Sequence, residues 1–172
     1  GFPAAYKAEF SVQMAADDVQ VLSGLSDVSP MAVRLYCPIN CTAGLVRFKI
    51  FSLRKVALSD SLPILEKMGA RVLDEHPYHV KDGTLDTENA GFWIHDLGLQ
   101  LPESTEFAEI RQRFEVLFVQ VWGNDCDSDD LNKLVLMTSL DARAIAVLRA
   151  YTRYFKQLGL PFSQSYLGVW AA

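Results

Sequence analysis

The sequence lacks the short motifs that carry most enzyme chemistry. It has no G-x-G-x-x-G turn for a dinucleotide, no G-x-x-x-x-G-K loop for a nucleotide phosphate and no G-x-S-x-G nucleophile elbow. Histidine and cysteine occur only three times each, and their spacing assembles neither a metal cluster nor a nucleophilic triad. The residues alone therefore predict no catalytic residue, no cofactor-binding residue and no metal ligand.

Long apolar runs and clusters of positive charge are also missing. No hydrophobic stretch approaches the roughly 20 residues of a membrane-spanning helix, and no signal peptide begins the chain. The net charge is −5 and the basic residues are scattered, so we expect neither a nucleic-acid nor a membrane partner. We expect a cytoplasmic protein in which Cys37, Cys41 and Cys126 are reduced thiols, because their spacing matches no common metal or redox motif.

What the sequence does contain, up to about residue 101, is an alternation of short strand-like and helix-like runs. Val46, Phe48 and Ile50 alternate with Arg47 and Lys49, which is typical of a half-buried strand. A proline in another strand-like run indicates an edge or a bulge. The order of runs predicts an α+β ferredoxin-like fold, an antiparallel sheet with helices on one face. The expected strands lie near residues 9–12, 31–37, 46–50, 70–80 and 92–99, and the expected helices at 15–25 and 58–69.

From about residue 105 onward the pattern is helical throughout. We therefore expect an α/β domain over residues 1–102 and a helical segment over residues 103–172, with a last helix starting near 163–170. Apolar stripes at helical spacing are usually core contacts between helices. Two such stripes are expected to be buried, one formed by Phe107, Ile110, Phe114, Leu117, Phe118 and Val121, the other by Ile145, Leu148, Tyr151, Phe155 and Leu158.

The histidines give no metal site. His76 and His79 are three apart in an expected strand, where they point to opposite faces and cannot share an ion. His95 is isolated in the sequence. We expect all three to have surface or half-buried structural roles.

Two acidic segments are candidate functional sites. The run from Asp125 to Asp130 resembles the start of a calcium loop, but its sixth position is Asp130 rather than Gly and its twelfth is Leu136 rather than Glu. We expect a solvated linker, with Asp129 or Asp130 capping the next helix. The pair Asp17-Asp18 is interpreted as helix-start chemistry rather than as a catalytic dyad.

One stretch is more specific than its periodicity. LSDSLPILEKMGARVLDEHPY, residues 58–78, closely resembles a segment of the large NAD-specific glutamate dehydrogenases of bacteria. The resemblance covers nearly the whole chain, and it implies an ACT-like regulatory module followed by the start of a helical region, both N-terminal to the catalytic domain. Further pieces occur in the family's order at residues 5–10, 33–36, 45–49, 93–96, 131–136, 147–151 and 161–164.

The resemblance implies that the whole enzyme converts L-glutamate, NAD and water to 2-oxoglutarate, ammonium and NADH. Its catalytic residues and NAD-binding fold belong to a part not present here, so it assigns this chain no catalytic or cofactor residue. ACT domains bind amino acids at dimer interfaces, so the implied partners are the other domains of the polypeptide, an amino-acid effector and a homo-oligomer. Because residues 12–16 contain no glycine, the usual ligand loop is not evident and the ligand-binding residues stay unknown.

The favoured hypothesis is a non-catalytic regulatory or architectural segment of an NAD-dependent glutamate dehydrogenase, which self-associates when isolated. A free-standing amino-acid-binding ACT-like sensor is the first alternative, and it would need a native Met start. The chain begins at Gly1 instead, which fits a processed start or an excised fragment. An independent enzyme with a site that no motif reveals is the second alternative.

Overall fold

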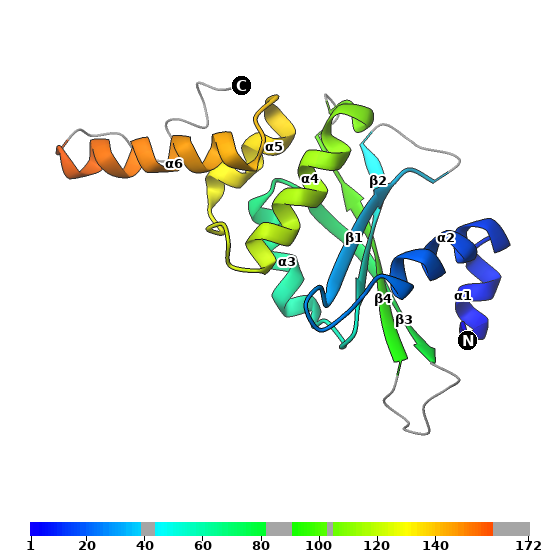
Figure 1. Cartoon of the computed structure of the whole chain (residues 1–172). Helices are drawn as coiled ribbons and strands as arrows, with labels where there is room; N and C mark the ends of the chain where they lie inside the picture. The colour runs from blue at the N-terminus through cyan, green and yellow to red at the C-terminus, as the bar shows by residue number, and fades with distance from the viewer. Residues whose placement is uncertain (39–43, 82–90, 103–104, 160–172) are drawn as a thin grey trace.

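A computed structural model describes residues 1–38, 44–81, 91–102 and 105–159. A central sheet lies between helices, and a long helix extends from one end of the molecule (Figure 1). The elements follow in the order α1 (Ala4–Glu9), α2 (Val12–Ser23), β1 (Met31–Tyr36), β2 (Leu45–Ser52), α3 (Leu58–Lys67), β3 (Arg71–Lys81), β4 (Gly91–Gln100), α4 (Phe107–Trp122), the 3-10 helix η1 (Asp130–Lys133), α5 (Leu134–Met137) and α6 (Ala142–Gln157).

The four strands form one antiparallel sheet in the order β1-β2-β4-β3. In a ferredoxin-like βαββαβ unit, the last strand pairs with the first at one edge of the sheet. Here β2, α3, β3, β4 and α4 form the βαββα part, and the edge position of the last strand is taken by β1, which comes before them in the sequence. The α+β ferredoxin-like prediction is therefore confirmed. Pro77 lies in β3, which is an edge strand as predicted, and a bulge interrupts the same strand between Val72 and Asp74.

The main core lies between one face of the sheet and helices α3, α4 and α5. The alternation in β2 places Phe48 on this face, where its ring contacts Phe114 at 5.6 Å and Phe118 at 4.9 Å between centroids. The predicted stripe of α4 is thus buried against the sheet, with Phe107 at its partly exposed start. Glu115 of α4 also accepts a hydrogen bond from the backbone N–H of Leu35 in β1. Residues on both sides of position 102 therefore share one core.

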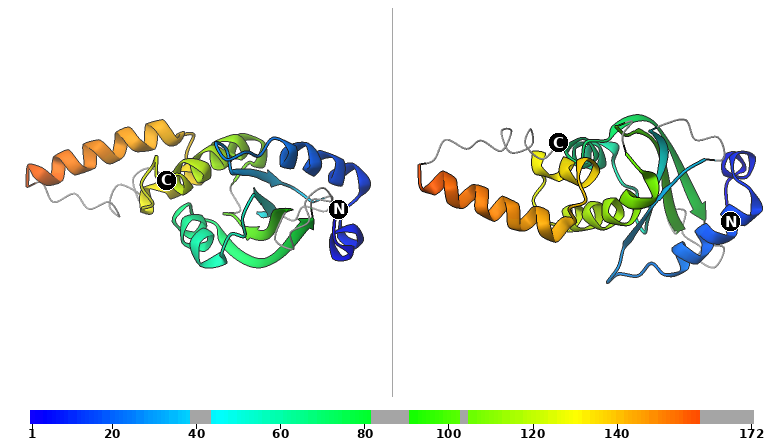
Figure 2. Two further views of the ribbon diagram at one scale, coloured as in Figure 1. Left: turned by 60° about the horizontal axis from the view of Figure 1, so that its bottom comes forward. Right: turned by 90° about the horizontal axis from the view of Figure 1, so that it is seen from above.

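Helices α1 and α2 cover the opposite face, on the far side of the sheet from α4 (Figure 2). The strand predicted near residues 9–12 is wrong: Glu9 ends α1, and Ser11 caps α2 by accepting from the backbone N–H of Met14. A second core holds these helices in place, formed by Tyr6, Leu22, Phe51, Tyr78, Val80 and Ile94. The expectation of helices on one face only is corrected accordingly. Residues 12–16 belong to α2, so their lack of glycine gives no information on a ligand loop.

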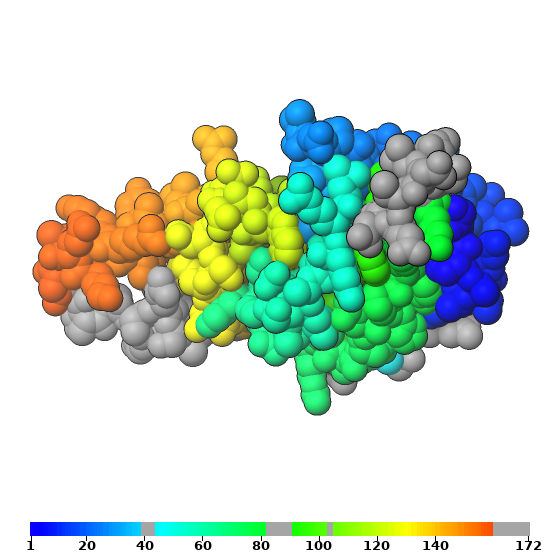
Figure 3. All heavy atoms as spheres, turned by 90° about the horizontal axis from the view of Figure 1, so that it is seen from below, coloured from blue at the N-terminus to red at the C-terminus, as the bar shows by residue number. Residues whose placement is uncertain are grey.

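Helix α6 is only partly buried, in contrast to the predicted stripe. Ile145 near its start lies in the main core, whereas Tyr151 and Leu158 are each 58% exposed. The first turns of α6 pack on η1 and α5, and the rest projects from the body, at the end opposite α1 and α2 (Figure 3). The helix expected near residues 163–170 lies outside the described residues. Among the described residues, no helix is long and apolar enough to cross a membrane.

Candidate functional site

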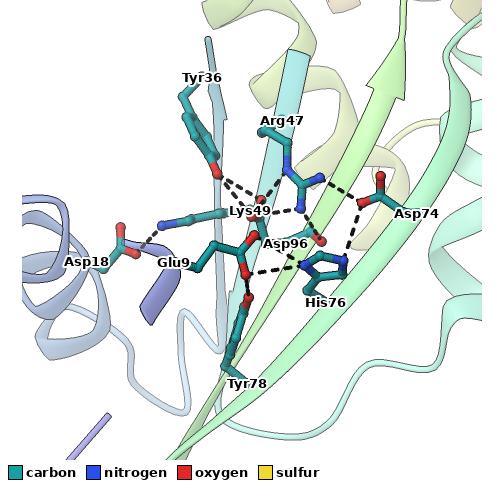
Figure 4. Close-up of polar contacts among 9 residues, drawn as sticks. All are labelled: Glu9, Asp18, Tyr36, Arg47, Lys49, Asp74, His76, Tyr78 and Asp96. Carbon is teal, nitrogen blue, oxygen red and sulfur yellow. Dashed lines mark hydrogen bonds and ion pairs between the residues drawn. The ribbon is translucent and has the colours of Figure 1, made fainter. Parts of the chain in front are cut away.

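A group of charged and tyrosine side chains lies on the sheet face beneath α1 and α2 (Figure 4). Side chains at odd-numbered positions of β2 point to this face, because the even-numbered ones enter the main core. We call this group the sheet-face cluster. It consists of Glu9, Asp18, Tyr36, Arg47, Lys49, Asp74, His76, Tyr78 and Asp96.

Lys49 and Asp18 form the buried centre of the cluster. The Lys49 ammonium donates to the Asp18 carboxylate at 2.5 Å, and the two side chains are 1% and 0% exposed. Asp18 also accepts from the Tyr6 hydroxyl at 2.5 Å and forms an ion pair with Arg34 at 3.3 Å. The ammonium lies 3.9 Å from the ring centroid of Phe10, a cation–π arrangement. These contacts tie α1 and α2 to the middle of β2, one of the two central strands of the sheet.

Arg47 of β2 and Asp96 of the neighbouring strand β4 form a second ion pair. The guanidinium donates to Asp96 from Nε and Nη2, at 3.3 and 2.9 Å, and to Asp74 from Nη1 at 2.7 Å. The Asp96 side chain is 1% exposed and also accepts from the Tyr36 hydroxyl at 3.0 and 3.1 Å. Forked contacts of this kind fix geometry as well as charge. They hold β1, β2, β3 and β4 in register on this face.

Glu9, the last residue of α1, meets the edge strand. Its carboxylate accepts a hydrogen bond from the Tyr78 hydroxyl and lies 3.3 Å from Nδ1 of His76. The Glu9 and His76 side chains are 40% and 47% exposed, so this contact forms the rim of the cluster. Asp74 lies 4.0 Å from Nε2 of the same histidine.

Burial shifts the titration of several groups in the cluster. Burial raises the pKa of Asp96, an effect that Arg47 opposes. Burial, followed by the neighbouring carboxylate Asp18, raises the pKa of Tyr6. Burial and Asp96 raise that of Tyr36, and burial and Glu9 raise that of Tyr78. The three hydroxyls therefore stay protonated at neutral pH and act as hydrogen-bond donors to carboxylates.

The cluster joins α1 and α2 to all four strands of the sheet. Arg47 and Lys49 each already pair with carboxylates, so neither is free to bind an anionic substrate. Structural ion-pair networks perturb pKa values as active sites do, so the shifts alone do not indicate catalysis. A cavity of about 470 Å³ lies beside the cluster.

The histidines behave as the sequence indicates, with one difference in burial. His76 faces α1, and His79 stacks on Trp93 on the opposite face at 4.6 Å. His95 is only 2% exposed, more buried than predicted. Its Nε2 accepts from the backbone N–H of Val56, so Nδ1 carries the proton and donates to Glu75 at 2.7 Å. The described residues contain no group of three or more His, Cys, Asp or Glu that could hold a metal ion.

The prediction that Asp129 or Asp130 caps the next helix is confirmed, whereas the interpretation of Asp17-Asp18 as helix-start residues is wrong. Asp129 caps η1 by accepting from the backbone N–H of Leu131, and it also binds the buried Arg149 at 2.6 Å. Asp18 does not serve the first turn of α2. It lies in the middle of that helix and points into the sheet-face cluster.

The two cysteines among the described residues differ in state. Cys37 is disulfide-bonded, so the expectation of a reduced thiol is wrong there. Cys126 is a free, partly exposed thiol that lies 3.5 Å from the guanidinium of Arg149. Cys41 lies outside the described residues.

Most of the sheet-face cluster was not singled out from the sequence. Lys49 was expected on the polar side of a half-buried strand, because nothing local shows that α2 covers that side. Two features of the sequence agree with the pair, although neither indicates that the two residues meet. Lys49 lies between two core residues in the most regular strand, and Asp18 precedes the buried Leu22 by one helical turn.

Comparison with protein families matches three successive parts of the chain. Residues 1–25 match the helical motif 2 of glutamate dehydrogenase, residues 30–111 its ACT3 domain and residues 126–169 its helical motif 3. The order agrees with the structure, in which α1 and α2 precede the sheet and η1, α5 and α6 follow it. The chain belongs to the NAD-specific glutamate dehydrogenase family. The resemblance inferred from residues 58–78 is thereby confirmed.

Individual relatives agree with this assignment. NAD-specific glutamate dehydrogenases of Halomonas elongata and Pseudomonas aeruginosa are each 37% identical over 171 residues, covering 98% and 97% of this chain. The enzyme of Mycobacterium tuberculosis is 30% identical over 174 residues, covering 96% of the chain. The chain spans about 10% of the length of these relatives. In the family's terms, the sheet-face cluster joins helical motif 2 to the ACT3 sheet.

Proposed function

We propose that this chain is a non-catalytic, architectural segment of a longer NAD-dependent glutamate dehydrogenase. The longer enzyme would convert L-glutamate, NAD and water to 2-oxoglutarate, ammonium and NADH. In this proposal the ACT3 sheet holds helical motif 2 on one face and leads, through α4, into helical motif 3 on the other. The buried pair of Lys49 and Asp18 carries the proposal, because it joins the first two of these parts at their centre.

The packing of the core supports the same role for the C-terminal part. We propose that the sequence is organised as an α/β domain at residues 1–102 and a helical segment at residues 103–172. The side chains of α4, α5 and the start of α6 nevertheless enter the main core beside those of the sheet. A rigid body of this kind would space the neighbouring domains of the enzyme. Neither a catalytic residue nor an NAD-binding residue is assigned to it.

Regulation by an amino acid is the second candidate function. ACT domains as a class bind amino acids, which suggests such regulation. The same binding would be expected if the chain were a free-standing sensor. The paired cations of the sheet-face cluster argue against recognition of an effector carboxylate there. An effector site is therefore expected elsewhere, at an interface with other domains or with a second copy in a homo-oligomer.

A cytoplasmic location is proposed for the enzyme.

The test introduces Asp18→Asn into the full-length protein and follows both assembly and activity. We expect a lower unfolding temperature with glutamate-dependent NAD reduction per assembled enzyme within about two-fold of wild type, because a purely architectural residue makes no interaction with the transition state. Asp17→Asn, the same change one residue earlier, is the matched control and should leave both quantities unchanged. A large loss of kcat in fully assembled, normally stable enzyme would contradict an architectural role.

A further inference from the structure

The cavity beside the sheet-face cluster has an unusual combination of walls. It lies between the end of α1, the start of α2 and the strands β1, β2 and β4, and its volume is about 470 Å³. Cavities of 300–1,000 Å³ with mainly apolar walls and a few converging polar groups are typical of small-molecule sites. Its lining residues are Glu9, Phe10, Ser11, Met14, Tyr36, Pro38, Arg47 and Asp96.

The charge on this wall is negative. Two carboxylates, Glu9 and Asp96, face one guanidinium, that of Arg47. Arg47 is already engaged by Asp96 and by Asp74 outside the wall. Among the described residues, the Glu9 carboxylate contacts the neutral Tyr78 hydroxyl and His76, which is charged only when protonated. Within the part of the chain that the structure describes, the Glu9 carboxylate is thus without a permanently charged cation.

The remaining walls favour an organic cation. The rings of Phe10 and Tyr36 line the cavity, and aromatic rings attract ammonium groups through their faces. The buried Lys49 ammonium lies 3.9 and 5.3 Å from their centroids. Met14 and Pro38 add apolar surface for a carbon chain. A metal ion would need more oxygen ligands than two carboxylates that face apolar walls can offer. An anion would meet the excess negative charge.

We propose that this cavity binds a small organic amine. The protonated nitrogen lies at the Glu9 carboxylate, on the cavity side of the Phe10 and Tyr36 rings and away from Lys49, and the carbon chain lies along Met14. The site goes beyond the architectural function, which holds whether or not the cavity is occupied. Occupancy would fasten α1 and α2 more firmly to the ACT3 sheet, because Glu9 and Phe10 lie at the junction of the two helices.

The experiment measures binding of n-butylamine hydrochloride to the chain by calorimetry and by thermal shift at pH 7.5. We expect saturable binding and an increase in unfolding temperature that grows with ligand concentration. Sodium chloride at equal ionic strength and n-butanol, the uncharged analogue, should give no saturable binding. Binding of the alcohol as strong as that of the amine would overturn the proposal, because the charge would then contribute nothing.

Glu9→Gln is the decisive variant, since glutamine keeps the shape and the hydrogen bond with Tyr78 but removes the charge. We expect amine affinity to fall about ten-fold, the value of roughly one charge-assisted hydrogen bond. Glu66→Gln, an exposed site on α3 across the sheet, is the matched control and should bind as wild type does. If Glu9→Gln fails to fold, Phe10→Leu replaces it, and it should weaken the amine while leaving butanol unaffected. Unchanged amine affinity in a folded variant of either kind would refute the site.

Discussion

Replacing Lys49 with methionine would show how strongly helical motif 2 is held on the ACT3 sheet. Methionine fills a similar volume without the ammonium, so packing is largely kept while the ion pair with Asp18 is lost. The Asp18 carboxylate would stay buried with only the Tyr6 hydroxyl and Arg34 as partners. Removing one member of a buried pair costs about 3–5 kcal/mol, because an uncompensated charge remains. Since Arg34 partly compensates, we expect a loss of about 3 kcal/mol.

The pair is best isolated by a double-mutant cycle with Asp18→Asn. The asparagine carbonyl can still accept from Tyr6, so the double variant contains neither buried charge. We expect it to be more stable than the sum of the single losses predicts, by about 2 kcal/mol, as for groups in direct contact. Urea unfolding followed by circular dichroism gives each free energy of unfolding. Additive losses within about 0.5 kcal/mol would refute the coupling, as would a Lys49→Met loss below about 1 kcal/mol.

Three further variants test other parts of the fold. Gly69→Ala should lower the free energy of unfolding by about 1–2 kcal/mol, because φ of +85° lies in the left-handed region, and urea unfolding measures it. His95→Phe should cost about 1–3 kcal/mol in the same assay, because Val56 N–H and Glu75 lose their buried partner. The pKa of Asp96 is raised by burial, so the folded protein holds that proton more tightly than the unfolded chain does. The stability this provides is present at low pH and is lost as pH rises from about 4 through the raised pKa. The free energy of unfolding of Asp96→Asn minus that of wild type should therefore increase over that window, and a flat difference would contradict the shift.

The sheet was largely predictable because its information is local. Period-2 alternation located β1 and β2, and Pro77 restricted its strand to an edge or a bulge. The stripe of α4 was equally clear over its 16 residues. The burial along α6 was not, because apolar spacing shows which residues share a face but not whether another element covers it.

The sheet-face cluster was not predictable, because its partners are distant in sequence. Lys49 and Asp18 are 31 residues apart, and a polar residue in an alternating strand is ordinarily exposed. Helix α1 is only six residues long, so its helical state depends on tertiary packing rather than on local propensity. Without α1 and α2 on the second face, the sequence gives no reason to bury either charge.

Native-state hydrogen exchange tests most directly whether the helical motif 2 region and the ACT3 sheet form one body. The account predicts that amides of α2 near Leu22 exchange only with the global unfolding that also releases the amides of β2. Lys49→Met should then lower the protection of α2 by a larger free energy than that of β2. If α2 already exchanges freely in the wild-type protein while β2 stays protected, helical motif 2 is not held on the sheet. The architectural role proposed for this segment would then be contradicted.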